Sequence, residues 1–217
     1  MGAINEHGKL ITAAARSALT PLGCNQISRS RTWISDERFW VIQIEFQPSG
    51  WSKGSYLNVG ASWLWRVQKS FAFDYGYRVA DFIVFETQEQ FAPLIAGHAR
   101  RAAEEVNALR NKFKTLAQIH RHLMDDIPRG GWALYHAAVA AGLSGDIAVA
   151  KQLFYDFDAW ANSPTWPTKL ESPAVQLASL LSEPDLYRAQ VSSIIDECRA
   201  LNGLMLQPNC LEYLAAG

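Results

Sequence analysis

The sequence has few of the features that assign a protein to a functional class directly. Only three of its 217 residues are cysteines, and Cys24, Cys198 and Cys210 lie far apart without a C-x-x-C pair. Neither a disulfide framework nor a zinc site fits this spacing, so we expect buried free thiols. Lysine and arginine number 20 against 21 for aspartate and glutamate. This balance excludes a global positive field that would attract nucleic acid or anionic lipid.

Targeting and membrane signals are also missing. No run approaches the ~18 consecutive apolar residues that a membrane-spanning helix needs. The first residues, Met-Gly-Ala-Ile-Asn-Glu-His, lack the basic and apolar regions of a secretory signal. We therefore expect a cytoplasmic globular protein that does not bind membranes.

The common catalytic and cofactor-binding motifs are absent. The chain contains no G-x-S-x-G, H-E-x-x-H, G-x-x-x-x-G-K-[ST] or G-x-G-x-x-G pattern. A binding protein without cofactor or metal is therefore favoured over an enzyme. An enzyme stays an alternative, because active sites can be assembled from residues far apart in the sequence.

Hydrophobic residues make up 49% of the chain, enough for a sizeable core. Helical spacing of apolar residues predicts a first helix over residues 4–20, which Pro21 and Gly23 end. Residues 28–86 then alternate with a period near two, which is typical of strands with one apolar face. Short links between consecutive strands favour an antiparallel meander. We expect about four strands, near residues 28–34, 39–47, 56–67 and 77–85.

Residues 88–124 carry apolar side chains at spacings of three and four, which predicts a long amphipathic helix. Pro93 or Gly97 could break it into two helices. The narrow apolar stripe over residues 95–123 suits packing on the sheet or another helix. The same stripe could also form the seam of a homodimer.

The segment from Asp125 to Gly131 is the best candidate for a domain boundary. We expect an α+β domain over residues 1–127 and a helical subdomain over residues 128–217, and the two could pack as one unit. In the second part, Asp146 lies in a helix's first turn, where its charge complements the helix dipole. The predicted helices span residues 132–141, 146–161, 174–182 and 185–202. The predicted fold class is therefore α+β with an all-helical C-terminal half.

A titratable cluster near residue 122 is the strongest catalytic candidate. His122 and Asp126 are four residues apart, so on a helix they share a face and could hold a metal or relay a proton. Asp125 lies beside them, whereas His120 falls on the apolar stripe. These residues support the alternative of a metal-dependent hydrolase or nuclease.

The polar face of the predicted sheet is the strongest binding candidate. Polar residues alternate with apolar ones, and tryptophan and tyrosine are frequent around them. Aromatic and arginine side chains are enriched at binding hot spots. The candidate binding residues are Gln43, Glu45, Gln47, Tyr56, Asn58, Arg66 and Tyr77.

Basic residues interleaved with aromatics can also bind single-stranded nucleic acid. Arg29 and Arg31 flank Trp33, which fits that pattern locally. The near balance of basic and acidic residues makes nucleic acid an unlikely partner.

Three sequence segments carry a resemblance to a known family. The first helix ends in Pro21-Leu22-Gly23-Cys24, a strand reads Val41-Ile42-Gln43-Ile44-Glu45-Phe46-Gln47, and Tyr56-Leu57-Asn58-Val59-Gly60 follows. Over about residues 5–90 the chain resembles an uncharacterised bacterial family of unknown function. Its members typically carry Gly-Phe after the first helix and an aromatic-x-Asn-hydrophobic-Gly strand. This chain departs from that pattern at Cys24, where the family usually has Phe, and at Glu45, where Asn or Gln is frequent.

The resemblance implies an α+β fold and carries over no catalytic residue. Small bacterial proteins of this kind are often encoded near toxin or defence genes. We therefore expect a non-enzymatic cytoplasmic protein that binds a protein partner, such as a toxin-neutralising immunity protein or a bacterial defence accessory factor. The hydrolase or nuclease with His122 and Asp126 and the structural homodimer remain the alternatives.

Overall fold

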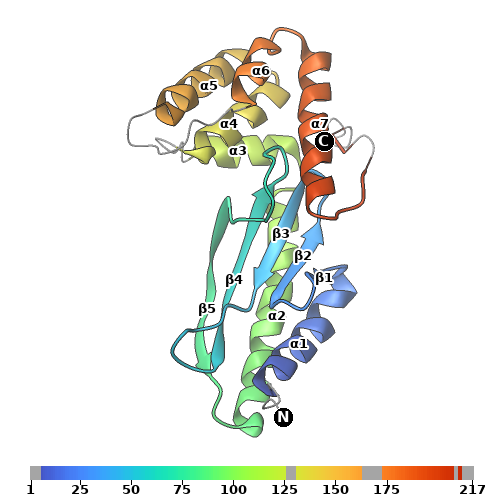
Figure 1. Cartoon of the computed structure of the whole chain (residues 1–217), viewed down its shortest axis with the longest axis vertical. Coiled ribbons are helices and arrows are strands. Elements are labelled where there is room, and N and C mark those ends of the chain that lie inside the picture. Colours follow the sequence, from blue (N-terminus) through green and yellow to red (C-terminus); the bar gives the residue numbers. More distant parts are fainter. Residues whose placement is uncertain (1–5, 126–130, 163–172, 208–209, 212–217) are drawn as a thin grey trace. The chain divides into compact units, whose positions relative to one another are not determined.

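The chain folds into two compact units of different architecture. The computed structural model describes residues 6–125, 131–162, 173–207 and 210–211 (Figure 1). The first unit comprises residues up to 62 together with 71–111, and the second comprises residues 63–70 together with those from 112 onward. The sequence-based boundary at residues 127/128 differs from this division, because the segment 63–70 and residues 112–125 belong to the second unit.

The first unit is built on an antiparallel sheet whose strands follow one another in sequence order. This confirms the predicted meander. The sheet has five strands rather than about four, because the short first strand pairs across a turn that the sequence placed inside a strand. Ser28 in this turn has a φ of 50°. The strands are β1 (Asn25–Gln26), β2 (Thr32–Asp36), β3 (Trp40–Glu45), β4 (Gly54–Trp63) and β5 (Tyr75–Val84).

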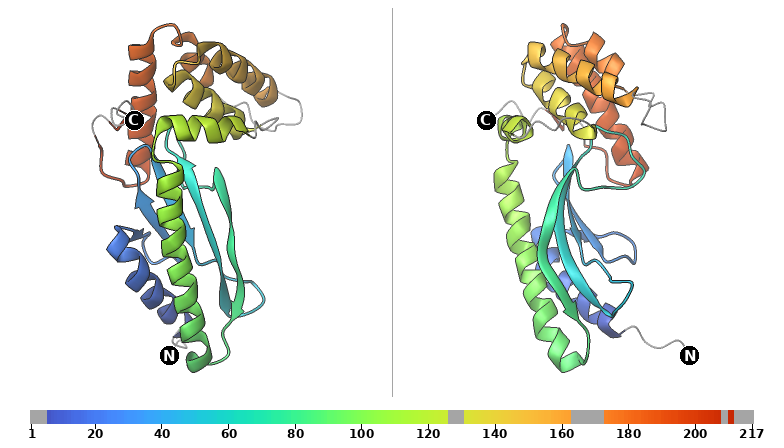
Figure 2. Two further views of the ribbon diagram at one scale, coloured as in Figure 1. Left: turned by 180° about the vertical axis from the view of Figure 1, so that it is seen from behind. Right: turned by 90° about the vertical axis from the view of Figure 1, so that its left-hand side faces the viewer.

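Helices cover one face of this sheet, and no helix in the described part of this unit covers the other. The helix α1 (Glu6–Leu19) is followed by the 3-10 turn η1 (Thr20–Leu22), and α2 (Gln88–Lys112) runs along the sheet (Figure 2). Apolar side chains of both helices are buried, as are the strand residues that alternate toward them. The buried set includes Ile11, Ala15, Leu19, Ile95, Val106, Leu109, Ile42, Ile44, Leu57 and Val59.

Arg110 fixes the end of α2 to the sheet. Its Nε donates to Glu37 Oε1 at 2.7 Å, and its Nη2 donates to Leu22 O at 2.8 Å and to Ser35 Oγ at 2.7 Å. Charge-assisted bonds of this kind are stronger than neutral ones. Cys24 is buried nearby, and burial raises the pKa of its thiol. All three cysteines are buried free thiols, as expected.

The long helix breaks at a different place from the one predicted. It continues through Pro93 and Gly97 and ends at Lys112, after which α3 (Leu116–Asp125) begins. Pro93 lies in the second turn of α2, where it removes one helical hydrogen bond without ending the helix. The actual break is set by Thr115, whose Oγ1 accepts from the Gln118 N–H at 3.2 Å while its own N–H donates to Gln118 Oε1 at 3.0 Å. This is a capping box, a helix-start signal that is legible in the sequence.

The predicted stripe over residues 95–123 is largely buried within the chain. Ile95, Ala99 and Val106 are buried in the first unit, and Leu116 and Ile119 are buried in the second. These side chains therefore already have neighbours in their own chain. A homodimer through this stripe stays a prediction.

The second unit is helical, as predicted for the C-terminal part. Together with α3 it contains α4 (Trp132–Leu143), α5 (Ile147–Ala161), α6 (Ala174–Ser179) and α7 (Pro184–Leu201). Asp146 is the N-cap of α5, and its side chain accepts from the Val149 N–H at 3.4 Å. None of the described helices is both long and apolar enough to cross a membrane.

Trp63, the last residue of β4, and Trp65 just after it are buried in this helical unit. The rings of Trp63 and Trp65 stack with centroids 5.5 Å apart, and the Phe113 ring meets Trp63 edge-on at 5.2 Å. Trp65 Nε1 donates to His136 Nδ1 at 2.9 Å, and the Tyr135 hydroxyl donates to Trp65 O at 2.8 Å. The segment 63–70 therefore supplies core side chains and hydrogen bonds to the second unit.

The edge strand β5 is regular in its first half and irregular in its second. Its register with β4 is constant from Ala61↔Tyr75 to Asn58↔Arg78, and it then shifts twice. Such shifts disturb the row of outward-facing backbone groups and protect a sheet edge. In the irregular half, His98 of α2 donates from Nε2 to Asp81 O at 3.0 Å. Burial lowers the pKa of His98, and the hydrogen bond to Asp81 opposes that effect.

We predict that Gly142→Ala destabilises the second unit by about 1–3 kcal/mol through overpacking. A Cβ on Gly142 would lie 2.5 Å from the Tyr187 ring and 2.9 Å from Leu181 Cδ2, and Tyr187 is 1% exposed. Urea denaturation followed by circular dichroism measures the loss. Gly97→Ala is the control, because its Cβ meets only Arg100 Nη2 at 3.9 Å. It should be neutral or stabilising by up to about 1 kcal/mol. Equal effects of the two substitutions would contradict the packing argument.

A second prediction concerns pH. Because the pKa of His98 is lowered in the folded chain, the unfolded chain binds a proton first as the pH falls below about 6.5. The free energy of unfolding should therefore decrease from pH 7.5 to pH 5.5. His98→Gln keeps a donor for Asp81 O and should flatten this slope, measured by denaturation at several pH values. The slope will not vanish, because burial also lowers the pKa of His7. An unchanged slope in the variant would refute the role of His98.

Candidate functional site

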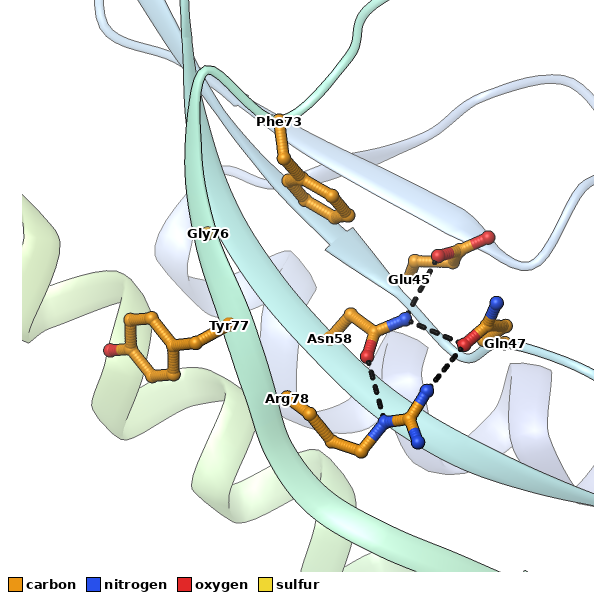
Figure 3. Close-up of a pocket in the computed structure, with 7 residues that line it drawn as sticks. All are labelled: Glu45, Gln47, Asn58, Phe73, Gly76, Tyr77 and Arg78. Atoms are coloured by element: carbon orange, nitrogen blue, oxygen red, sulfur yellow. Dashed lines mark hydrogen bonds between the residues drawn. The ribbon is translucent and has the colours of Figure 1, made fainter. Parts of the chain in front are cut away.

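The helix-free face of the sheet carries a pocket of about 460 Å³. Strands β4 and β5 and the residues at the end of β3 form its floor, and the segment before β5 contributes an aromatic ring (Figure 3). All residues that line it belong to the first unit. They are Glu45, Gln47, Asn58, Phe73, Gly76, Tyr77 and Arg78.

Four polar side chains form a continuous hydrogen-bonded network across the strands. Asn58 Nδ2 donates to Glu45 Oε2 at 3.1 Å and to Gln47 Oε1 at 3.0 Å. Arg78 Nη2 donates to the same Gln47 oxygen at 3.1 Å, and Arg78 Nε lies 3.5 Å from Asn58 Oδ1. Asn58 therefore lies at the centre of the network, where it bonds to Glu45, Gln47 and Arg78 (Figure 3).

Arg78 is held in place but not neutralised. Its guanidinium carbon lies 3.9 Å from the centroid of the Tyr56 ring, which packs in turn on Phe82 at 4.8 Å. Its hydrogen-bond acceptors are amide oxygens, and it forms no ion pair in the part of the chain that the structure describes. An exposed guanidinium on an aromatic ring, with its position fixed in advance, is well suited to bind an anionic group.

Phe73 forms the aromatic wall of the pocket and lies over two glycines. Gly60 and Gly76 face each other across β4 and β5. A Cβ on Gly60 would lie 2.4 Å from the Phe73 ring and 2.3 Å from Tyr75 O. A Cβ on Gly76 would lie 2.9 Å from the same ring. The ring can approach the strands this closely only because both positions lack a side chain.

The three residues named in the pattern Tyr56-x-Asn58-x-Gly60 all lie in this site. Because side chains alternate along a strand, residues two apart share a face. Tyr56 supports Arg78, Asn58 joins the network, and Gly60 leaves room for Phe73. Each of the three residues in this sequence pattern thus has a physical role in the site.

The structure brings together Glu45, Gln47, Tyr56 and Asn58 of the seven predicted binding residues. Gln43 is two residues from Glu45 on β3, and its buried Oε1 has no hydrogen-bond partner among the described residues.

The other two predicted binding residues do not join the polar network, although Tyr77 lines the pocket. The Tyr77 ring points away from the polar network toward α2 (Figure 3), where its hydroxyl donates to Glu105. Burial and this carboxylate raise the pKa of Tyr77. Arg66 belongs to the second unit, with its guanidinium carbon 4.6 Å from the centroid of the Trp132 ring.

Sequence reasoning missed Phe73, Gly76 and Arg78. Arg78 is opposite Asn58, and Gly76 is opposite Gly60. The alternation around residues 77–85 indicated a strand but not its register with β4. Eleven residues, 64–74, separate the two strands, and part of that connection belongs to the other unit. A register over such a connection is not fixed by turn geometry.

The predicted catalytic cluster is only partly described. His122 is half-buried with its ring 5.1 Å from that of Phe113, and Asp125 is exposed. Asp126 lies outside the described residues. Over the described ranges, no three His, Cys, Asp or Glu side chains are grouped so that they could hold a metal ion. A hydrolase or nuclease with His122 and Asp126 stays a prediction.

Comparisons with known proteins do not identify the function of this site, so its geometry alone is interpreted. No family model, no curated protein and no solved structure matches this chain.

We predict that Gly60→Ala displaces Phe73 and destabilises the sheet by about 1–3 kcal/mol, because the new Cβ would overlap the ring and Tyr75 O. Thermal unfolding measures the loss. Gly50→Ala adds the same methyl group where no atom lies within 4 Å, and it should change stability by less than about 0.5 kcal/mol. If Gly60→Ala were as stable as Gly50→Ala, the close approach of Phe73 would not be a constraint.

Proposed function

We propose that this chain is a non-enzymatic protein-binding protein whose partner docks on the helix-free face of the sheet. The observation that carries the proposal is the exposed Arg78, held on Tyr56 and bonded to two amide side chains beside the Phe73 ring. Arginine and aromatic residues dominate the binding energy of protein interfaces. A fixed arginine loses little conformational entropy when a partner binds.

The form of the pocket favours a protein partner over a small molecule. Small-molecule sites are concave and bury most of the ligand surface. Here the side chains of Glu45, Asn58 and Arg78 come from one face of adjacent strands, and Gly76 and Arg78 are exposed. A partner surface can cover such a face and exclude water from the network around Asn58, which strengthens its hydrogen bonds.

Trp51 is a second contact candidate in the same unit. It lies on the loop between β3 and β4 and is 99% exposed. Tryptophan is strongly enriched among residues that carry binding energy. A large apolar ring left in water offers a partner much surface to bury.

The specific form of this proposal is a cytoplasmic toxin-neutralising immunity protein or bacterial defence accessory factor. The family resemblance over about residues 5–90 supports that form, and the Tyr56, Asn58 and Gly60 positions that carry it lie at the proposed binding face.

Site-specific photocrosslinking tests the proposal. Replacing Phe73 by p-benzoylphenylalanine keeps an aromatic ring in the pocket, and irradiation of the native host cells should give a discrete protein adduct. Replacing Tyr155, which is 71% exposed on α5, by the same amino acid is the control and should not give that adduct. The adduct partner is then identified by mass spectrometry and purified.

The affinity of the purified partner provides the second part of this test. Arg78→Gln should weaken binding about tenfold or more, because it removes a fixed charge from the interface centre. Arg101→Gln removes the same charge from an exposed position on α2 and should leave the affinity within about twofold. The proposal fails if no adduct is specific to position 73, or if the two arginine variants bind alike.

A further inference from the structure

We infer that the partner places an aspartate or glutamate side chain on Arg78 and an apolar side chain against Phe73. This inference deepens the proposed function, and it concerns only the chemistry of the segment that occupies the pocket. It follows from the hydrogen bonds that the guanidinium has already made and from the charges that line the pocket.

A guanidinium presents two edges that can each bind two acceptors. In Arg78 the edge formed by Nε and Nη2 faces the amide oxygens of Asn58 and Gln47. The other edge, formed by Nη1 and the second N–H of Nη2, has no acceptor among the described residues (Figure 3). A carboxylate matches that edge with two parallel hydrogen bonds. Because the Tyr56 ring and the two amides fix the guanidinium, this edge is presented in one orientation.

The charges of the pocket favour a carboxylate over a phosphate. Its lining contains one cation, Arg78, and one carboxylate, Glu45. Phosphate sites combine several donors or positive charges because a phosphate carries nearly two negative charges at neutral pH. The Glu45 carboxylate would oppose such a group more strongly than a singly charged side chain.

Phe73 sets the second requirement. Its half-buried ring lies over Gly60 and Gly76, next to Asn58 and Arg78 in the same pocket. An apolar side chain near the acidic residue would cover this ring and exclude water from the new ion pair. Side chains two apart in an extended segment share a face, so an acidic and an apolar residue separated by one position can occupy both places.

Selection from a phage-displayed library of random 12-residue peptides tests this inference on the intact chain. We expect the peptides retained by the wild-type protein, but not by Phe73→Ser, to be enriched in an acidic residue two positions from an apolar residue. Retention by Arg101→Gln should equal that of the wild type, and Arg78→Gln should lose these peptides. The selected peptides are then synthesised with amidated C-termini, so that only side-chain carboxylates remain.

A double-mutant cycle measures the contact directly. Replacing the acidic residue of a selected peptide by its amide should weaken binding to the wild type about tenfold and binding to Arg78→Gln by less than about twofold. The inference is overturned if no peptides are enriched, if the enriched peptides lack an acidic residue, if the two substitutions add independently, or if binding requires a free C-terminal carboxylate. If one of these results is found while the photocrosslinking experiment gives an adduct specific to position 73, the proposed function still holds. In that case only the acidic and apolar chemistry of the bound segment is wrong.

Discussion

The alternation of side chains along β4 is the constraint on which the rest of this structure depends. Leu57, Val59 and Ala61 are buried on the helix-covered side of the sheet. Tyr56 and Asn58, on the opposite side, build the candidate site. Since a shift of one residue would exchange the two sets, the hydrophobic core and the site enforce the same register. The geometry of the site is therefore maintained by the folding free energy of the first unit.

The end of the same strand changes its role. Beyond Ser62 the chain enters the second unit, where Trp63 and Trp65 stack on each other and Trp65 bonds to His136. Burying two indoles contributes several kcal/mol of hydrophobic free energy in a helical unit of modest size. A single continuous segment thus supplies the core of one unit, the floor of the candidate site and part of the core of the other unit.

The electrostatics of the site explain why polar side chains can lie on a half-buried sheet face without great cost. Asn58, Gln47 and Arg78 satisfy one another's hydrogen-bonding groups, so partial burial leaves few of them unmatched. Because the network uses neutral oxygens to hold the guanidinium, it fixes the position of Arg78 without neutralising its charge. A direct bond to Glu45 would have neutralised this charge. Instead Asn58 lies between the two groups and bonds to both.

Patterns read from the sequence predicted much of the fold. The period near two indicated the strands, and helical periodicity placed α1, α5 and α7 within a few residues of their ends. The break of the long helix was wrong because Pro93 was given more weight than the capping box at Thr115 and Gln118. A proline early in a helix removes one hydrogen bond, whereas a capping box supplies two at a new start.

The sequence predicted only those residues of the candidate site whose position follows from alternation within a single strand. Period-two alternation on β3 and β4 identified Glu45, Tyr56 and Asn58 as neighbours on a polar face, because strand geometry puts alternate residues on one side whatever the rest of the fold. The arginine that completes the site could not be chosen this way. Arg66 follows β4 in sequence but belongs to the second unit, whereas Arg78 is opposite Asn58 through a register set across the long connection between β4 and β5. Local periodicity is a property of the chain itself, but pairing between strands separated by such a connection is decided only when the two strands meet in the folded sheet.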